Sequence, residues 1–316
     1  MKVNLLFPGQ GSQYVGMGKV LEGKESFQLL KKADDVLGYK LSKIMLEGPE
    51  EELKLTQNTQ PAILTYSIAL YQEVKKILQD QGIEVDHVMG HSVGEYAALV
   101  AAGTLSFEDA LLLVHNRGKF MQEAVPASEG AMYALLKVPE DIVEKACQIS
   151  SRPGYVVMPA NFNDPDQIVI SGHNGACEDA VKWISENYEL PHRAIALQVS
   201  APFHSTLMKP ASEKLAEIFE KVTFKPNSIP YIANIDSKVY VAGTPESTIR
   251  ENLLNQVAGS VLWYQSFRKL QDESKCLEIG PGKVLFGLGR KINKSIKILP
   301  LDKENALTEM ETFLKG

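Results

Sequence analysis

The sequence has 316 residues, of which 44% are hydrophobic and 23% are charged. This length suggests about two domains, and the composition is that of a globular protein rather than a disordered or fibrous chain. The formal net charge of −6 argues against nonspecific binding to nucleic acid, although a local basic patch could still receive an acidic partner.

The cysteines and the apolar runs indicate in which cellular compartment the protein works. Cys147, Cys177 and Cys276 are scattered, without the spacing typical of metal sites, so we expect reduced thiols and no bound metal. The N-terminal apolar run ends at Pro8, too early for a secretory signal, and the longest nearly apolar run, residues 97–105, is far below the ~20 residues of a membrane helix. We therefore expect a soluble cytoplasmic protein without membrane contact.

The first part of the chain alternates strand patterns with helical ones. We predict a strand at 3–7, helices at 26–37 and 60–79, a strand at 85–89, and helices at 95–102 and 107–123. Ser106 is the expected N-cap of the last helix, because its hydroxyl can accept a hydrogen bond from a free N–H group of the first turn.

The middle of the chain has a different order of elements. We predict a strand at 131–138, a helix at 140–149, strands at 155–160 and 167–171, a helix at 174–188 and a strand at 192–199. This βαββαβ order is typical of a ferredoxin-like unit. We therefore place a small domain at residues 127–197, inserted into a larger domain made of residues 1–126 and 198–316.

The last part of the chain returns to alternating elements. We predict helices at 207–222 and 246–257, and strands at 229–234, 275–279 and 296–299. Strands that alternate with helices favour a mainly parallel sheet covered on both faces, so the fold class is α/β.

The pentapeptide Gly90-His91-Ser92-Val93-Gly94 follows a predicted strand and precedes a predicted helix. In one use of this G-x-S-x-G pattern, a serine nucleophile stands on a tight strand-to-helix turn that only glycines can flank. The alternative is a chance match in a glycine-rich loop. The strand and helix on either side favour the nucleophile interpretation of Ser92.

A serine nucleophile needs a base, and His204 is the candidate because it follows a proline-bounded loop where the chain re-enters the larger domain. The other histidines are interpreted as structural or solvated. No Asp or Glu has the placement of a triad acid, so a backbone carbonyl could orient the imidazole instead. Arg117, on the helix after the pentapeptide, would offer a planar fork to a carboxylate, or would form a surface salt bridge.

Several motifs in order along the chain carry a resemblance to a known family. They are Phe7-Pro8-Gly9-Gln10-Gly11-Ser12-Gln13, Gly90-His91-Ser92-Val93-Gly94-Glu95-Tyr96, Arg117-Gly118, Asn161-Phe162-Asn163, Ala201-Pro202-Phe203-His204 and Glu278-Ile279-Gly280-Pro281-Gly282. Together they resemble the malonyl-CoA:acyl carrier protein transacylases, from residue 3 to about residue 290. The resemblance implies an α/β-hydrolase-like large domain and a ferredoxin-like small domain.

The resemblance also implies an activity and a site. Ser92 would take malonyl from malonyl-CoA and pass it to the phosphopantetheine thiol of acyl carrier protein, with His204 as the base and the Gln256 carbonyl orienting the imidazole. The N–H groups of Gln10 and Val93 would form the oxyanion hole, and Arg117 would pair with the malonyl carboxylate.

Further residues follow from the same resemblance. Phe203 matches the bulky residue of malonyl-selective members, and Asn161 is a candidate for contact with CoA or the carrier protein. The charge of Arg193 could receive the acidic carrier protein, or Arg193 could be a solvated surface residue. Phosphopantetheine travels with the substrates, so no cofactor of the protein's own is expected, and we expect a monomer.

Three rival functions are kept. The same transfer could serve a polyketide synthase rather than fatty-acid synthesis, which one chain cannot distinguish. A serine hydrolase or lipase could use the same turn, although Arg117 argues against an apolar acyl group. A non-catalytic module that docks carrier protein would not need Ser92, His204 and Arg117 together.

Overall fold

The computed structural model describes residues 1–126 and 128–315, and it contains two β-sheets with helices around them. The strands are β1 (Lys2–Phe7), β2 (Glu84–Gly90), β3 (Gly130–Leu136), β4 (Val157–Asp164), β5 (Gln167–His173), β6 (Arg193–Ala196), β7 (Tyr231–Ile232), β8 (Val239–Tyr240), β9 (Lys275–Glu278) and β10 (Lys297–Pro300). The α-helices are α1 (Gln28–Leu37), α2 (Leu41–Glu47), α3 (Glu50–Lys54), α4 (Thr56–Asp80), α5 (Gly94–Ala101), α6 (Phe107–Glu123), α7 (Glu140–Ser150), α8 (Asn174–Asn187), α9 (Lys209–Phe219), α10 (Glu246–Ala258), α11 (Trp263–Phe267), α12 (Val284–Ile292) and α13 (Ala306–Lys315).

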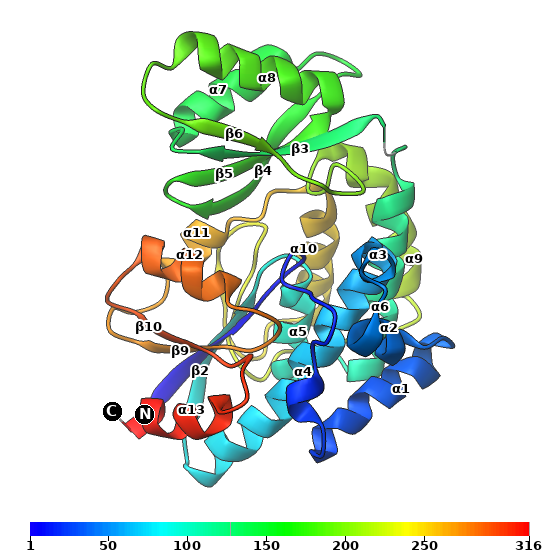
Figure 1. The fold of residues 1–316 in the computed structure, drawn as a ribbon, viewed down its shortest axis with the longest axis vertical. Coiled ribbons are helices and arrows are strands. Elements are labelled where there is room, and N and C mark those ends of the chain that lie inside the picture. The colour runs from blue at the N-terminus through cyan, green and yellow to red at the C-terminus, as the bar shows by residue number, and fades with distance from the viewer. Residues whose placement is uncertain (127, 316) are drawn as a thin grey trace.

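The larger sheet has the strand order β10-β9-β1-β2-β7-β8. Its first five strands run parallel, and β8 pairs antiparallel to β7 at the edge. Helices lie on both faces, with α4, α5 and α6 on one side and α11 and α12 on the other (Figure 1). Parallel sheets are covered on both faces, which is why β1 is apolar along most of its length and buried from Val3 onward.

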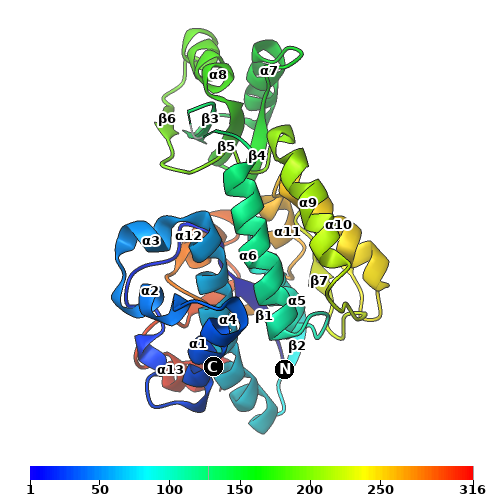
Figure 2. The same ribbon diagram turned by 90° about the vertical axis from the view of Figure 1, so that its right-hand side faces the viewer.

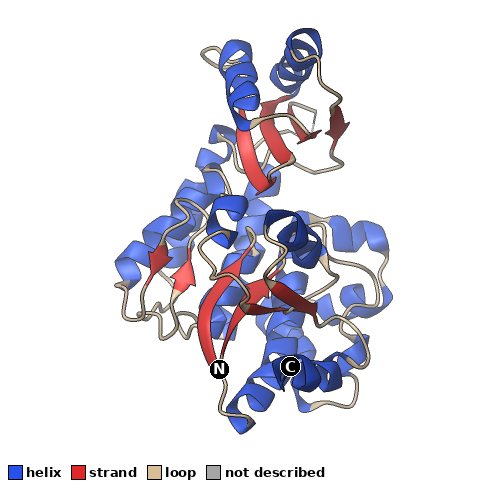
Figure 3. Cartoon of the chain, turned by 90° about the vertical axis from the view of Figure 1, so that its left-hand side faces the viewer, coloured by secondary structure: helices blue, strands red, loops and turns tan. Residues whose placement is uncertain are grey.

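The smaller sheet is antiparallel and has the order β4-β5-β3-β6. Helices α7 and α8 pack together on one face, with their own apolar core centred on Ile170 and Val143. This unit lies at one end of the molecule, above the larger sheet, and the two sheets remain distinct in a view from the side (Figures 1 and 3).

The predicted α/β class is confirmed, with a mainly parallel sheet and an inserted βαββαβ unit of ferredoxin-like order. The exact domain boundaries stay a prediction, and residue 127, where the small domain was predicted to begin, lies outside the described residues, as does residue 316. Within these described residues, no helix has both the length and the apolar character that a membrane span requires.

Helix α6 illustrates a correct local prediction, and α4 a partly wrong one. The structure places α6 at the predicted residues, with the Ser106 hydroxyl accepting from the Asp109 N–H at 3.0 Å. Helix α4 begins at Thr56, four residues before the predicted start, so Pro61 is inside the helix. Proline cannot donate to the carbonyl of Gln57, and Nδ1 of His115 lies 3.1 Å from that oxygen and can donate to it instead. A side chain from α6 thus compensates for the proline.

Candidate active site

Ser92 occupies a sharp turn between β2 and α5. Its φ angle is +51°, a left-handed conformation that non-glycine residues rarely adopt. A Cβ atom on Gly90 would collide with the backbone of Gly94, and one on Gly94 would collide with the Phe7 carbonyl. Both flanking positions therefore require glycine, and the turn holds Ser92 at the carboxyl end of a parallel strand.

His204 lies beside Ser92. Its Nε2 is 2.7 Å from the Ser92 hydroxyl oxygen, and its Nδ1 is 2.9 Å from the Gln256 carbonyl and 3.2 Å from that of Gly259. Gln256 is in the last turn of α10, where helix carbonyls have no partner within the helix and are free to accept from a side chain. An Nδ1–H that donates to these carbonyls leaves the Nε2 lone pair facing Ser92.

The imidazole of His204 is neutral in this surrounding. Burial lowers its pKa to about 3, and the positive charge of Arg117 acts in the same direction. The two backbone carbonyls oppose this shift, but more weakly. A neutral imidazole can accept the Ser92 proton, which is the requirement for a general base.

Arg117 reaches the same place from α6, with a side chain that is 1% exposed. Its guanidinium donates to Oε1 of Gln60 at 2.8 Å, to Oε1 of Gln256 at 2.9 Å and to the Ser92 hydroxyl at 3.1 Å. Among the described residues, no carboxylate is within salt-bridge distance of it. The surface salt bridge that the sequence left open is therefore wrong. A buried guanidinium held only by neutral acceptors is suited to an anionic ligand.

The loop after β1 packs against the Ser92 turn. The Phe7 carbonyl accepts from the His91 N–H at 2.9 Å, and Gly9 lies directly against the His91 carbonyl. Gln10 follows and lines the same cavity as Ser92. In the part of the chain that the structure describes, neither the Gln10 nor the Val93 N–H has a hydrogen-bond acceptor. Both are thus available to an oxygen bound near Ser92.

Two further side chains hold this arrangement, and sequence reasoning missed them. Asn234 accepts from the Ser92 N–H at 2.7 Å and donates to the Gly90 carbonyl at 2.7 Å. The Glu95 carboxylate accepts from Nε2 of Gln256 at 2.7 Å and from the Asn234 N–H at 3.2 Å. Glu95 directly follows the pentapeptide and Asn234 ends a predicted strand, so their places at the carboxyl edge of the sheet were a usable signal.

These residues open onto a cavity of about 170 Å³ between the two sheets. It is lined by Gln10, Gln60, His91, Ser92, Arg117, Met121, Met132, Asn161, Asn163, Val169, Leu197, Val199, Phe203 and His204. The structure therefore brings together Ser92, His204, Arg117, Gln10, Asn161 and Phe203. Nε2 of His91 is 2.8 Å from Oδ1 of Asn163, which links the Ser92 turn to β4 of the smaller sheet. In the side view, α6 rises along the larger sheet toward the smaller one (Figure 2).

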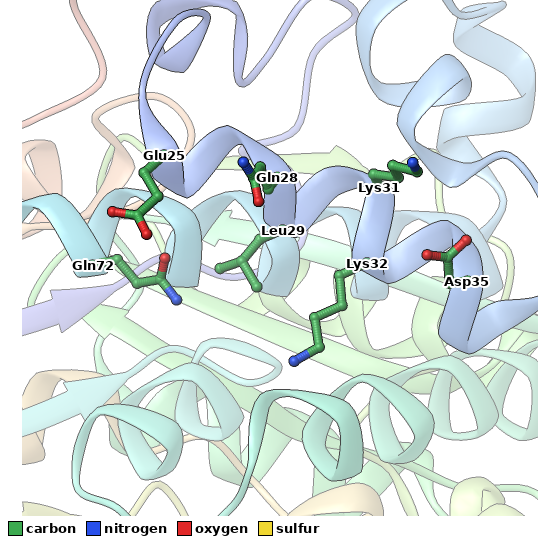
Figure 4. A pocket seen from close by; sticks show the side chains of 7 residues that line it. All are labelled: Glu25, Gln28, Leu29, Lys31, Lys32, Asp35 and Gln72. Atoms are coloured by element: carbon green, nitrogen blue, oxygen red, sulfur yellow. The ribbon is translucent and has the colours of Figure 1, made fainter.

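Val93 and Gln256 adjoin the cavity residues without lining the cavity, whereas Arg193 lies away from them. It is exposed on β6 and lines a separate hollow with Lys137 and His192. A larger hollow of about 680 Å³ lies on α1 and α4 (Figure 4). Its charged side chains have both signs, and Lys32 there is paired with Glu108, so it offers no coherent set of groups for chemistry.

Comparison with known proteins places this fold and geometry in a family. The model of the acyl transferase domain matches residues 5–266. A malonyl CoA-acyl carrier protein transacylase from Bacillus subtilis is 45% identical over 99% of this chain and 97% of its own. The crystal structure of an acyl carrier protein S-malonyltransferase from Vibrio cholerae is 38% identical, with a TM-score of 0.89 over 98% of this chain and all of that one.

A third relative was solved with a partner. This malonyl-transacylase, in complex with a type II PKS acyl-carrier protein, is 37% identical, with a TM-score of 0.88 over 98% of each chain. Since the family model and these relatives cover nearly the whole sequence, this chain belongs to the malonyl CoA-acyl carrier protein transacylase family of acyltransferases.

Proposed function

We propose that this protein transfers malonyl from malonyl-CoA to the phosphopantetheine thiol of acyl carrier protein, through a malonyl ester on Ser92, for fatty-acid synthesis. The observation that carries the proposal is the convergence of a neutral His204 and a buried Arg117 on the Ser92 hydroxyl. The pair of Ser92 and His204 supports acyl transfer, and Arg117 supports an acyl group with a free carboxylate.

In the first half-reaction, His204 takes the Ser92 proton while the serine oxygen attacks the thioester carbonyl. The negative charge on the carbonyl oxygen is met by the N–H groups of Gln10 and Val93, each worth about 3 kcal/mol to the transition state when preorganised. The C–S bond then breaks, and His204 returns the proton to the departing CoA thiolate. Cleavage of the thioester thus leaves malonyl on Ser92 and free CoA.

The second half-reaction repeats these steps in reverse order with another thiol. His204 takes the proton of the phosphopantetheine thiol, the sulfur attacks the ester carbonyl, and the proton returns to the Ser92 oxygen. The phosphopantetheine group arrives on the carrier protein, so the enzyme needs no cofactor of its own for this exchange. Asn161 at the cavity and Arg193 on the smaller sheet are candidates for contact with CoA or the carrier.

Selectivity for malonyl follows from the burial of Arg117. A malonyl carboxylate accepts charge-assisted hydrogen bonds from its guanidinium, whereas an acetyl group offers the guanidinium no acceptor. Phe203 is 7% exposed and lines the cavity, which supports a role in excluding bulkier acyl groups. One added methyl group changes binding by only about 1–3 kcal/mol, so discrimination against methylmalonyl is expected to be weaker than discrimination against acetyl.

The test compares transfer with hydrolysis. Purified protein is mixed with malonyl-CoA with and without holo acyl carrier protein, and CoA release and malonyl-carrier are measured. We expect rapid malonyl-carrier formation and slow hydrolysis without the acceptor, with both lost in Ser92→Ala. Hydrolysis at the same rate with or without carrier protein would instead support the serine hydrolase.

A second pathway has one observation in its favour. The relative solved with its partner binds a type II PKS acyl-carrier protein, so the same chemistry could serve polyketide synthesis in this chain too. Competition between a fatty-acid carrier protein and a polyketide carrier protein for malonyl from the same enzyme distinguishes the two pathways.

A further inference from the structure

Arg117 is a buried cation whose direct hydrogen-bond partners are all neutral. They are the side-chain oxygens of Gln60, Gln256 and Ser92. A buried charge without compensation is expensive, and neutral hydrogen-bond acceptors offset only part of that cost. The protein must therefore supply a negative charge nearby.

Glu95 is that charge, one side chain away. The Gln256 amide joins the two groups, because its Oε1 accepts from Arg117 at 2.9 Å while its Nε2 donates to Oε2 of Glu95 at 2.7 Å. Glu95 is 1% exposed, and its second oxygen, Oε1, has no hydrogen-bond partner among the described residues. Only one of the two carboxylate oxygens thus accepts hydrogen bonds, and the main ionic partner of the carboxylate is Arg117.

The other ionisable groups around Glu95 do not replace this pairing. Asp236, after β7, is a second negative charge and disfavours ionisation of Glu95. Tyr96 on the same helix and Tyr231 on β7 are neutral phenols, since burial raises the pKa of each. Arg117 from α6 is therefore the only positive charge among the described residues that favours the ionised form of Glu95.

A malonyl group changes the charge count in this cluster. In the free enzyme, Arg117 and Glu95 sum to zero. The carboxylate of malonyl on Ser92 adds one negative charge and takes over the pairing with Arg117. Two carboxylates would then lie near one buried guanidinium. Glu95 no longer pairs with Arg117, so its ionised form costs more free energy than that of the malonyl carboxylate.

We propose that Glu95 is the resident counter-ion of Arg117, and that loading of malonyl onto Ser92 makes Glu95 bind a proton, which it releases when malonyl leaves for the carrier protein. This proposal rests on the proposed function. Glu95 acts through Arg117 and Gln256 and is a positioning residue rather than a catalytic one.

The acidity of Glu95 suits this exchange. Burial raises the pKa of its carboxyl to about 7, even with the hydrogen bonds from Gln256 and Asn234 and the charge of Arg117 acting in the opposite direction. Removal of the Arg117 pairing and addition of a second carboxylate both raise this pKa further. At about pH 7.5, the free enzyme therefore holds Glu95 mainly ionised and the malonyl-enzyme holds it mainly protonated.

Acylation of Ser92 changes the proton concentration very little by itself. The Ser92 O–C bond forms, the C–S bond breaks and the serine proton ends on the CoA thiol, so the chemical step neither consumes nor releases a proton. Free CoA ionises only slightly at this pH, because an unperturbed thiol has a pKa of about 8.5. Hydrolysis of malonyl would release a proton rather than take one up, so net uptake of protons comes from the protein.

The experiment measures proton uptake and adduct formation together. Malonyl-CoA is added to the protein in weakly buffered solution at about pH 7.5 with a pH indicator, and intact mass gives the fraction of malonyl-enzyme. We expect the wild type to take up more than half a proton per malonyl adduct. We expect Glu95→Gln to form the adduct with little uptake, because the amide keeps the shape of the carboxyl and cannot titrate.

Glu278→Gln is the matched control. Glu278 is also a fully buried carboxyl whose pKa burial raises to about 7, but it caps α12 through the N–H groups of Leu285 and Phe286 and does not line the cavity. This variant should take up as many protons per adduct as the wild type.

The outcomes separate this proposal from the proposed function. Full adduct in the wild type without uptake would overturn the proposal, and so would equal uptake in Glu95→Gln. Absence of any malonyl adduct in the wild type would contradict the proposed function instead.

A second measurement covers the case in which Glu95→Gln does not fold. An infrared difference spectrum of the wild type, loaded with ¹³C-malonyl to shift the substrate bands, should gain the C=O band of an unlabelled carboxylic acid and lose a carboxylate band. A loaded enzyme without this change would overturn the proposal.

Discussion

The smaller sheet and the polar cluster around Ser92 are built in opposite ways. The core of the smaller sheet consists of apolar side chains and two cysteines, and it comes from one continuous stretch of chain between residues 130 and 196. The cluster gathers polar side chains from five separate stretches, which contribute Ser92 with Glu95, Arg117, His204, Asn234 and Gln256. Nearly all of these side chains are buried, and Ser92 and His204 both have positive φ angles.

The difference teaches which kind of change each region tolerates. An apolar core loses stability in proportion to the volume removed and keeps its shape when the change is small. In the polar cluster, each side chain forms a hydrogen bond with another member or balances its charge. Removal of one member therefore leaves a buried partner without a hydrogen bond or without a counter-charge. Truncation of a side chain should therefore be mild in the smaller sheet and severe around Ser92, where only a substitution that keeps the hydrogen bonds, such as Glu95→Gln, should be tolerated.

The largest expected effect is that of His204→Ala. Loss of a general base should slow formation of malonyl-enzyme by about 10²–10⁴-fold, because the Ser92 proton then has no acceptor at 2.7 Å. Rapid-quench measurement of the acylation burst gives the rate, and a thermal melt shows whether the variant is folded. An unchanged burst in a folded variant would contradict the role of His204.

Arg117→Ala should follow, with an effect that depends on the acyl group. The loss of charge-assisted hydrogen bonds to the malonyl carboxylate corresponds to about 3–4 kcal/mol, or a few hundredfold in kcat/KM for malonyl-CoA. Acetyl loading should be kept or improved, since an acetyl group has no carboxylate to pair with Arg117. Arg117→Lys, which keeps the charge without the planar fork, should recover only part of the malonyl activity. Equal losses with both acyl groups would refute the carboxylate clamp.

Glu95 should also give the cluster a pH-dependent stability. The pKa of its carboxyl is about 7 in the folded protein and 4.5 in its ordinary state, so between these pH values the unfolded chain loses the proton while the folded protein keeps it. The stabilisation is complete below pH 4.5 and is lost as the pH rises to 7. The free energy of unfolding of the wild type should therefore fall, relative to Glu95→Gln, by about 3 kcal/mol between these limits.

Urea unfolding of both proteins across this range measures the difference. The opposite contribution of His204, whose pKa is lowered, is present in both proteins and cancels. A constant difference across the range would mean that the Glu95 carboxyl does not titrate there.

The smallest effect is expected in the core of the smaller sheet. Ile170 is fully buried between α7, α8 and the strands, and Ile170→Val removes one methylene group there. The free energy of unfolding should fall by about 1 kcal/mol. Steady-state transfer should keep the wild-type kcat/KM, and a loss of transfer comparable to that of Arg117→Lys would remove the contrast between the two regions.

The same contrast explains how much the sequence could predict. The elements of the smaller sheet follow from alternation and helical spacing within one stretch, so their order and approximate bounds are confirmed. Short elements escaped, among them α3, α11 and β8, because a helix of five residues or a strand of two is stabilised by its neighbours rather than by its own pattern.

The polar cluster was predictable only in part. Ser92 could be proposed from its turn, and His204 and Arg117 from the order of motifs along the chain. In the structure, His204 and Arg117 both lie within hydrogen-bond distance of the Ser92 hydroxyl. Glu95 and Asn234 were missed because their partners lie more than a hundred residues away in the sequence, and their places at the carboxyl edge of the sheet were the one signal that could have pointed to them.

The most direct test of the central claim is the mass of the acylated protein. Wild type and Ser92→Ala are mixed with malonyl-CoA, methylmalonyl-CoA or acetyl-CoA, and the adduct is measured on the intact protein and located by peptide mapping. We predict a malonyl adduct on the Ser92 peptide of the wild type, with far less acetyl adduct and none in Ser92→Ala. A malonyl adduct that persists in Ser92→Ala, or acetyl loading as efficient as malonyl loading in the wild type, would contradict it.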